Sequence, residues 1–303
     1  MRTAILDDGQ CSLGEAFIAA LARTVTDGTL VFHGFGSPLV QLALHVAKRT
    51  HAPHMVLIAG ATYAVNPRPP FLPPTSNDWV LDRDAEGALD IEELFDLAAS
   101  GRMGRMFLSG VQIDRWGNAN VTRLGQGERA KKLPGGGGGG NLSADAGAVT
   151  LWTAAQRART DRAGRRLLRL MEPVDFVTNL GHRAPDGRSR RELGHRGGGP
   201  DWLVTDLGLF DFVDGELRLV ALYPDTTVDL VRDNTGFPLR EAADIATIPM
   251  PDAETVAIIR ALDPALVHEH EISPEDRDRR FPLGPSIVVR PPAGMVAAAG
   301  VNR

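Results

Sequence analysis

The chain has 303 residues, of which 43% are hydrophobic and 23% are charged, an ordinary composition for a globular protein. A formal net charge of −5 and a pI of about 5.9 argue against a general nucleic-acid binder. Cys11 is the only cysteine, so an internal disulfide is excluded, which fits a reducing cytoplasm.

The sequence shows neither a signal peptide at its N-terminus nor a membrane-length apolar stretch. The N-terminus lacks the apolar segment of a signal peptide, and no stretch approaches the apolar length of a membrane helix. We therefore expect a cytoplasmic protein. Because we find no long internal repeat and no clear linker, we expect one domain at residues 1–272, followed by a charged and proline-rich extension at 273–303.

The first third of the chain alternates between helix and strand patterns. Ser12 and Glu15 have the spacing of a capping box, and an apolar helical face follows them. Two apolar strand candidates, 30–32 and 55–59, enclose a glycine turn at 34–38 and a helical pattern at 39–48. This order is typical of a βαβ unit in a parallel sheet, whose ligands bind where the strands end. The turn is therefore either a ligand-binding turn or a tight packing turn.

Residue 39 is leucine, so the turn is not a dinucleotide-binding fingerprint, and no G-K-[ST] motif of a P-loop occurs. The later elements follow from the same periodicities. We expect a proline-rich loop at 66–78, a helix at 89–100, a strand at 106–108, a turn at 114–118, a mobile loop at 183–200, strands at 203–205 and 217–222, and a helix at 251–262.

Six consecutive glycines, Gly135 to Gly140, precede Asn141. Glycine loses the most backbone entropy on ordering, so we expect the run to form neither helix nor strand. Without side chains, its N–H groups can point at a carbonyl oxygen or an anion. The run is therefore either a loop that approaches a ligand closely or a disordered surface loop.

Charged groups elsewhere give weaker signals. Asp114 and Asn118 suit a turn whose side chains bond its own backbone. Residues 268–271 alternate histidine and glutamate, but no third ligand is evident, so we favour a solvated charged turn and predict no metal site. Four cations near the turn and the glycine run can bind an anion or be merely solvated. They are Arg115, Arg129, Lys131 and Lys132.

Several blocks, in order along the chain, resemble the beta-type subunit of family I coenzyme A transferases of the glutaconate CoA-transferase group. They are GFGSP at 34–38, AKRTHAP at 47–53, VQIDRWGNAN at 111–120, VDFVT at 174–178, VTDLGLFDF at 204–212 and NTGF at 234–237. The resemblance implies an α/β fold of the NagB/RpiA/CoA-transferase type, with an open, mainly parallel sheet and flanking helices. It also implies an alpha-type partner chain in a heteromer, with coenzyme A as part of the substrate.

One departure from the family pattern concerns its nucleophile. In the transferases, a glutamate just after the second strand attacks the acyl-CoA carbonyl, but residues 57–64 here contain no acid. The later blocks, 219–224 and 231–235, are similar to the beta subunit of steroid ring-opening CoA-thioester hydrolases, whose working carboxylate comes from the alpha subunit. The resemblance therefore implies hydrolysis or C–C (ring) cleavage of an acyl-CoA with a partner glutamate.

The same resemblance suggests roles for the candidate residues. Gly36, Gly137 and Asn141 would stabilise an oxyanion or position the substrate. Coenzyme A would be bound by Gly135, Gly136 and the four cations Arg115, Arg129, Lys131 and Lys132. Two alternatives stay open, namely true CoA transfer between carboxylic acids and a non-catalytic structural partner subunit. A sugar-phosphate isomerase of the same fold lacks support in the motifs.

Overall fold

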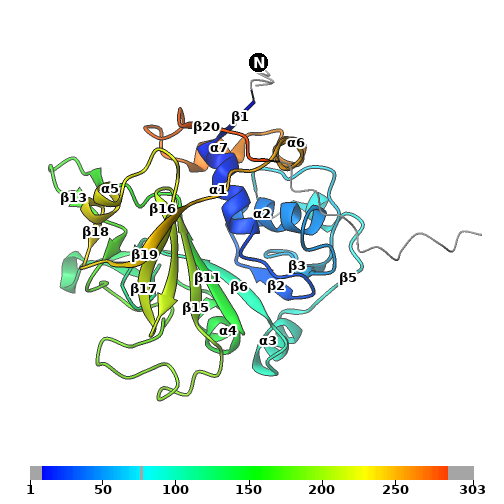
Figure 1. Ribbon diagram of the computed structural model, residues 1–303. Coiled ribbons are helices and arrows are strands. Elements are labelled where there is room, and N and C mark those ends of the chain that lie inside the picture. The colour runs from blue at the N-terminus through cyan, green and yellow to red at the C-terminus, as the bar shows by residue number, and fades with distance from the viewer. Residues whose placement is uncertain (1–8, 76–77, 286–303) are drawn as a thin grey trace, which may run out of the picture.

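The computed structural model describes residues 9–75 and 78–285, and a ten-stranded sheet runs through the middle of the molecule (Figure 1). Its strands are, in sheet order, β19 (Arg240–Thr247), β17 (Glu216–Leu222), β16 (Gly208–Val213), β15 (Pro200–Thr205), β11 (Ala148–Thr153), β6 (Arg105–Ser109), β2 (Leu30–His33), β3 (Val56–Ile58), β4 (Ala64–Val65) and β5 (Gly87–Ala88). The five central strands, from β3 to β15, pair in parallel, as do β17 and β19. The predicted α/β class with a mainly parallel sheet is confirmed.

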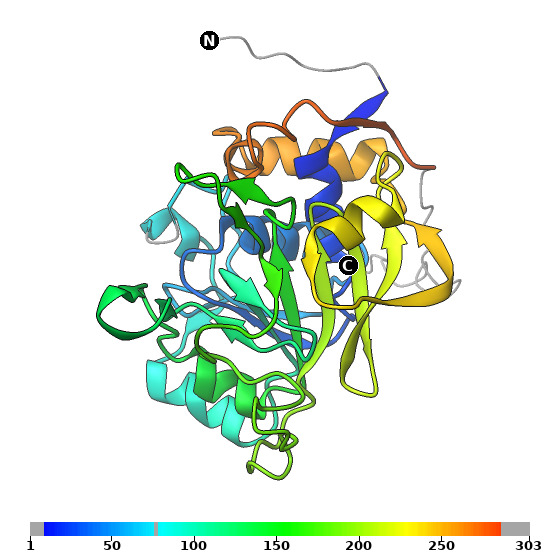
Figure 2. The ribbon, with the colours of Figure 1, turned by 90° about the vertical axis from the view of Figure 1, so that its left-hand side faces the viewer.

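Helices cover both faces of this sheet (Figure 2). The α-helices are α1 (Leu13–Ala22), α2 (Pro38–Arg49), α3 (Ile91–Ala99), α4 (Gly139–Asp145), α5 (Val228–Asp233), α6 (Ala253–Leu262) and α7 (Val267–Glu271), and two short 3₁₀ helices are η1 (Trp79–Asp82) and η2 (Gly127–Arg129). One apolar core lies under α1, α2 and α6, and the other lies under α3 and α4.

Neighbouring residues of the central strands point to opposite cores. Val31 belongs to the core under α1 and α2, whereas the next residue, Phe32, belongs to the core under α3 and α4. Leu57 and Ile58 of β3 divide in the same way. This follows from the two-residue period of a strand, and it explains why the central strands are continuously apolar in sequence.

Local signals set the start of several helices. Ser12 Oγ accepts a hydrogen bond from the Glu15 N–H at 3.1 Å, and a Glu15 carboxylate oxygen accepts one from the Ser12 N–H at 2.8 Å, so the predicted capping box is present. Pro38 begins α2, where its missing N–H removes no helical bond. Asp252 caps α6 by accepting from the Thr255 N–H at 2.9 Å.

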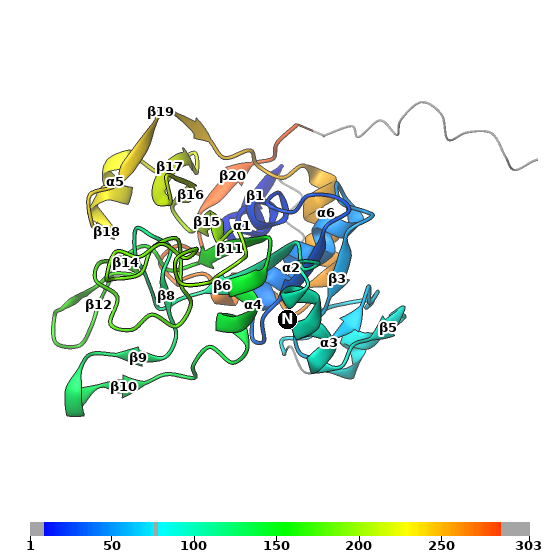
Figure 3. The ribbon, with the colours of Figure 1, turned by 90° about the horizontal axis from the view of Figure 1, so that it is seen from below.

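The chain also forms smaller sheets that are separate from the ten-stranded sheet. A four-stranded sheet contains β18 (Thr235–Gly236), β14 (Leu170–Met171), β7 (Gln112–Ile113) and β8 (Ala119–Asn120). Two-stranded ribbons are formed by β9 (Arg123–Leu124) with β10 (Lys131–Lys132) and by β12 (Arg159–Thr160) with β13 (Arg166–Leu167). The ribbon of β9 and β10 stands away from the body of the molecule (Figure 3).

The two ends of the described chain meet. Strand β1 (Gln10–Ser12) pairs antiparallel with β20 (Arg280–Pro282). Arg279 adds an ion pair with Asp225 at 2.6 Å, so residues beyond 272 contact the sheet domain. The boundary expected at 272/273 stays a prediction, and residues 1–8 and 286–303, which include most of the expected extension, lie outside the described residues.

None of the helices in the described ranges combines the length and apolar character needed to cross a lipid bilayer.

Candidate functional site

A buried histidine joins the turns that follow β2 and β3, at the C-terminal ends of the parallel strands. His33 Nε2 accepts a hydrogen bond from the Gly60 N–H at 3.1 Å, and Nδ1 lies 3.1 Å from the Gly34 carbonyl oxygen. These partners place the ring proton on Nδ1, which donates to Gly34. Burial lowers the pKa of His33 to about 4, so the ring is neutral near pH 7 and serves as a fixed connector.

The turn after β3, residues 59–62, leaves little room for a side chain at its second position. A Cβ atom on Gly60 would lie 2.5 Å from the carbonyl oxygen of His33 and 2.8 Å from that of Gly34. The neighbours of Gly60 in this turn are alanine and threonine, so the turn carries no carboxylate. Gly36 lies in the adjacent exposed turn between β2 and α2, with a φ of +71° that favours glycine.

The glycine run connects the ribbon of β9 and β10 to α4. Gly135 and Gly137 have φ values of +92° and +51°, and the Gly135 N–H donates to the carbonyl oxygen of Val121 at 2.8 Å. The expectation that the run forms no helix is wrong for Gly139 and Gly140, which are the first two residues of α4.

Tertiary packing explains why Gly139 and Gly140 are helical, because it overrides the low helix propensity of glycine. A Cβ atom on Gly138 would lie 2.6 Å from Phe95 Cζ in α3, and one on Gly136 would lie 2.6 Å from Thr178 Cγ2. Helices α3 and α4 lie side by side (Figure 2), and the glycines allow this close approach. The run is therefore packed against its neighbours.

Part of the run presents unsatisfied backbone donors. Within residues 9–75 and 78–285, the N–H groups of Gly136 and Gly137 have no hydrogen-bond acceptor. Asn179 lies beside Gly139, and its buried Oδ1 atom has no partner among the described residues. Buried polar groups without partners are uncommon in proteins, so this corner of the molecule is suited to a polar ligand. No sequence motif indicated Asn179.

A cavity of about 280 Å³ lies at the ends of β6 and β11. Val121, which accepts the Gly135 N–H, lines it, and so do the charged side chains of Arg159, Arg169 and Glu271. Burial, and then the charge of Arg159, lowers the pKa of Arg169. Two neighbouring guanidinium groups make the cavity attractive to an anion.

The charged side chains that line this cavity have no signature in the sequence. Arg159, Arg169 and Glu271 come from β12, the segment before β14 and the end of α7, and no local spacing connects them. The Nε1 atom of Trp152, which also lines the cavity, is buried without a partner among the described residues.

The predicted cations occupy different environments. Lys131 and Lys132 are exposed on β10, and Asn141 is exposed on α4, just after the glycine run. Arg115 instead forms ion pairs with Glu172 and, at 3.5 Å, with Glu216 at the β16–β17 hairpin. The side chain of Arg129 lies outside the described part of the structure. The glycine run and Asn141 thus follow the two lysines along the chain, whereas Arg115 is engaged by two carboxylates.

Two further sequence hypotheses concern polar turns. Asp114 Oδ1 accepts from the N–H groups of Trp116 and Asn118, each at 2.9 Å, so the predicted self-bonded turn is confirmed for Asp114. The Asn118 side chain instead donates to the Arg183 carbonyl oxygen and accepts from the Gly181 N–H, each at 2.8 Å. The solvated-turn hypothesis is wrong for His268, which is buried with Nδ1 2.7 Å from an Asp263 carboxylate oxygen. Although burial lowers it, the pKa of His268 is raised to about 9 by bonds to Asp263 and Glu269. In the described part of the chain, no group of three or more metal-binding side chains is found.

The model of one known family, described as Coenzyme A transferase, matches residues 15–234. The B subunit of 3-oxoadipate CoA-transferase from Pseudomonas knackmussii is 30% identical over 263 residues, covering 86% of this chain and 96% of the relative. The B subunit of glutaconate CoA-transferase from Acidaminococcus fermentans is 29% identical, covering 82% and 92%. The IpdB subunit of a cholesterol ring-cleaving hydrolase from Rhodococcus jostii is 29% identical, covering 62% and 70%.

Solved structures agree with these relatives. The decarboxylase AibA/AibB superposes with a TM-score of 0.72 and 29% identity, covering 86% of this chain and 98% of the matched chain. Glutaconate CoA-transferase from Acidaminococcus fermentans gives a TM-score of 0.70 and 25% identity, covering 84% and 96%. The mainly parallel sheet and flanking helices described above are thus the CoA-transferase fold, and this chain belongs to the coenzyme A transferase family.

Proposed function

We propose that this chain is the beta-type subunit of a heteromeric enzyme that hydrolyses an acyl-CoA thioester or cleaves one of its C–C bonds. In this proposal a glutamate of an alpha-type partner chain is the base or nucleophile. The observation that carries it is the turn after β3, where residues 59–62 contain no carboxylate and Gly60 is enclosed by His33 and Gly34. A chain without the carboxylate cannot form the glutamyl intermediate of a transferase from this position.

The names of relatives support chemistry other than transfer. A relative at 29% identity is the IpdB subunit of a ring-cleaving hydrolase, and a structure at 29% identity is a decarboxylase. Ring opening and decarboxylation both break a C–C bond, so the family scaffold serves reactions of this class. Transfer remains the second candidate, because a relative at 30% identity is the B subunit of a CoA-transferase.

The glycine run provides the proposed stabilisation of negative charge. The N–H groups of Gly136 and Gly137 would donate to the thioester or enolate oxygen, and a donor of this kind typically lowers a barrier by about 3 kcal/mol. Gly36, in the turn after β2, and Asn141, on α4, are proposed to position the acyl group.

The cations provide the proposed binding energy. Lys131 and Lys132, with Arg129, would contact the phosphates of coenzyme A, while Arg159 and Arg169 would bind an anionic group of the substrate in the cavity that they line. Arg115 is the weakest member of the predicted set, since two carboxylates already neutralise it.

The experiment is to co-express this chain with an alpha-type subunit and incubate the complex with β-keto and cyclic acyl-CoA esters, with and without acetate. Mass spectrometry follows free CoA, acetyl-CoA and the acyl-CoA product. We expect a hydrated, ring-opened or decarboxylated product without acetyl-CoA. Acetyl-CoA formation would instead establish transfer. If the complex assembles and turns over none of these esters, the non-catalytic alternative is favoured.

Two variants of this chain test which subunit of the complex supplies the reacting and positioning groups. Glu271→Gln removes the carboxylate that lines the cavity of this chain, and we expect it to retain most of the rate because the working carboxylate belongs to the partner. Loss of all activity would place the base in this chain and contradict the proposal.

Asn141→Ala changes an exposed side chain, so assembly should persist while the rate falls about tenfold or more. An unchanged rate would support a structural subunit.

A further inference from the structure

A second cavity lies at the opposite end of the parallel sheet from the glycine run. It has a volume of about 650 Å³, and the loop at 183–199, which leads into the start of β15, forms much of its wall. Helix α4 connects the two regions, with the glycine run at its start and the carbonyl groups bound by this loop at its end. Its seven residues span roughly 10 Å, so the two sites are separate.

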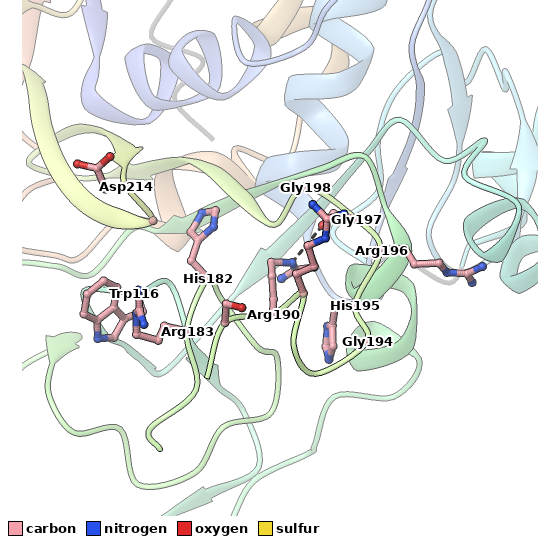
Figure 4. Close-up of a pocket in the computed structure, with 13 residues that line it drawn as sticks. Trp116, His182, Arg183, Arg190, Gly194, His195, Arg196, Gly197, Gly198 and Asp214 are labelled. Atoms are coloured by element: carbon pink, nitrogen blue, oxygen red, sulfur yellow. Dashed lines mark hydrogen bonds between the residues drawn. The ribbon is translucent and has the colours of Figure 1, made fainter. Parts of the chain in front are cut away.

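One buried arginine fixes the shape of this cavity. Arg190, which is 6% exposed, donates hydrogen bonds to the carbonyl oxygens of Leu180 and Gly181, each at 2.9 Å, and of Ser143 at 2.8 Å. Its Nε atom donates to the carbonyl oxygen of Gly197 at 3.1 Å, and the geometry is visible in Figure 4. In the described part of the chain no carboxylate forms an ion pair with it, and burial, only partly offset by the charge of Asp145, lowers its pKa.

Further donors line the cavity without a carboxylate partner. Arg183 stacks over the ring of Trp116 at 5.1 Å and donates to the Gly187 carbonyl oxygen. Arg191 is exposed, and no ion pair or hydrogen bond of its side chain occurs among the described residues. The Nδ1 atom of His195 is buried and has no partner in the same ranges. The lining therefore contains more donors than the protein itself satisfies.

The nearby acids have other direct partners. Asp145 is paired with Arg196 at 2.9 Å, and Glu192 accepts from the Ser189 hydroxyl at 2.7 Å. The Arg196 side chain points away from Arg190 (Figure 4). Asp214 is exposed and lies 3.5 Å from Arg240. Arg183, Arg190 and Arg191 therefore surround one cavity without a direct carboxylate partner, and Glu192 and Asp145 act on Arg183 and Arg190 only through longer-range charge.

We propose that this cavity binds a phosphorylated small molecule, held by Arg183, Arg191 and His195 with Arg190 behind them. The volume lies in the range of ordinary small-molecule sites, and several arginine and histidine side chains line the cavity, which favours a negatively charged ligand. A phosphate carries up to two negative charges and several acceptor oxygens, so it matches two unpaired guanidinium groups, whereas one carboxylate leaves a guanidinium unmatched.

Two sources of phosphate fit this chemistry, and the experiment separates them. One is a free inorganic or sugar-type phosphate, for which inorganic pyrophosphate is the probe. The other is a nucleotide, for which adenosine 3′,5′-bisphosphate is the probe. Tighter binding of the bisphosphate than of pyrophosphate assigns the site to a nucleotide, and the reverse order assigns it to a free phosphate.

The test is isothermal titration calorimetry on the complex of this chain with its alpha-type partner, at low salt. We expect one saturable site per chain for at least one probe, weakened about tenfold or more by Arg191→Ser and further by Arg183→Ser. Arg188→Ser is the matched control, since Arg188 lies on the same loop, pairs with Asp186 at 2.7 Å and does not line the cavity.

Two results would overturn the proposal. One is the absence of saturable binding up to about 10 mM of either probe, a concentration well above the dissociation constants of specific phosphate sites. The other is an equal loss of binding in Arg188→Ser, which indicates non-specific attraction to a basic loop. Arg191 is exposed and makes no described contact, so Arg191→Ser keeps the test valid even if Arg183→Ser disturbs the stacking on Trp116.

Discussion

The two ends of the parallel sheet hold their glycine-rich loops by opposite means. At the C-terminal ends, Phe95 and Thr178 occupy the space that side chains on Gly138 and Gly136 would need, and backbone N–H groups are left exposed. At the N-terminal ends, Arg190 donates hydrogen bonds to backbone carbonyl groups of three segments. Glycine thus allows close backbone packing at both ends of the sheet. The C-terminal end offers backbone N–H donors, whereas the N-terminal end offers arginine side chains.

Replacing Arg190 by methionine should have the largest effect on stability, because this residue holds the loop at the N-terminal ends of the parallel strands. The change leaves five carbonyl contacts without their donor, so we expect the free energy of unfolding to fall by about 3–5 kcal/mol. Urea denaturation measures this change, with Arg188→Ala as an exposed control that should leave the curve unaltered. A loss below about 1 kcal/mol would show that Arg190 does not hold the loop.

Gly138→Ala tests the C-terminal end. The new Cβ atom would lie 2.6 Å from Phe95 Cζ, so we expect overpacking to cost about 1–3 kcal/mol in thermal or urea unfolding. Gly140→Ala is the matched control in the same run, because its nearest contact is the Thr178 carbonyl oxygen at 3.4 Å. That variant should be neutral or up to about 1 kcal/mol more stable, as alanine favours a helix. Equal effects at both positions would contradict the packing argument.

His33 gives the C-terminal end a pH dependence. Its pKa is about 4 in the folded chain and near 6.5 when unfolded, so only the unfolded chain takes up this proton between those values. Stability therefore falls as the pH decreases from 6.5 toward 4, by about 1 kcal/mol over the first unit. His45, whose pKa burial lowers to about 3, contributes in the same direction.

Comparing wild type with His33→Asn isolates the first contribution. Urea denaturation at pH 7.0 and pH 5.5 should show a smaller loss of stability on acidification in the variant, whatever its stability at pH 7.0. Equal losses in the two proteins would mean that the ring takes up a proton in the folded chain.

The exposed lysines of the β9–β10 ribbon should have the smallest effect on the fold. Replacing both Lys131 and Lys132 by alanine should leave unfolding unchanged, since both side chains are exposed. If they bind the phosphates of coenzyme A, KM for the acyl-CoA rises about 3- to 10-fold with kcat preserved. Arg83→Ala, an exposed change outside the ribbon, serves as the control. An unaltered KM would remove the lysines from the site.

The parts of the fold that sequence predicts depend on nearby residues. The capping box of Ser12 and Glu15 and the self-bonded turn of Asp114 and Asn118 involve partners three or four positions apart. The βαβ order follows from apolar runs and a glycine turn, because periodicity and turn chemistry act over the same short distances. The absence of an acid at 57–64 is equally visible in the sequence.

The remaining features depend on segments that are distant in the chain. Arg190 binds carbonyl groups at 143–144 and 180–181, and Arg159 and Glu271 line one cavity although more than a hundred positions separate them, so no local pattern indicates either. The sequence predicts Gly139 and Gly140 to be non-helical because propensity counts only the glycine itself. These glycines pack beside Leu108 and the Thr178 carbonyl oxygen, neighbours that only the tertiary structure supplies.

The pairing of β1 with β20 affects the order in which the protein is made. Residues 10–12 find their partner only once residues 280–282 have been synthesised. At about 5–20 residues per second, a growing chain waits on the order of tens of seconds between the two events. During that time the strands of the ten-stranded sheet, which does not include β1, are all synthesised. The pairing of β1 with β20 therefore comes after every strand of the ten-stranded sheet has been made.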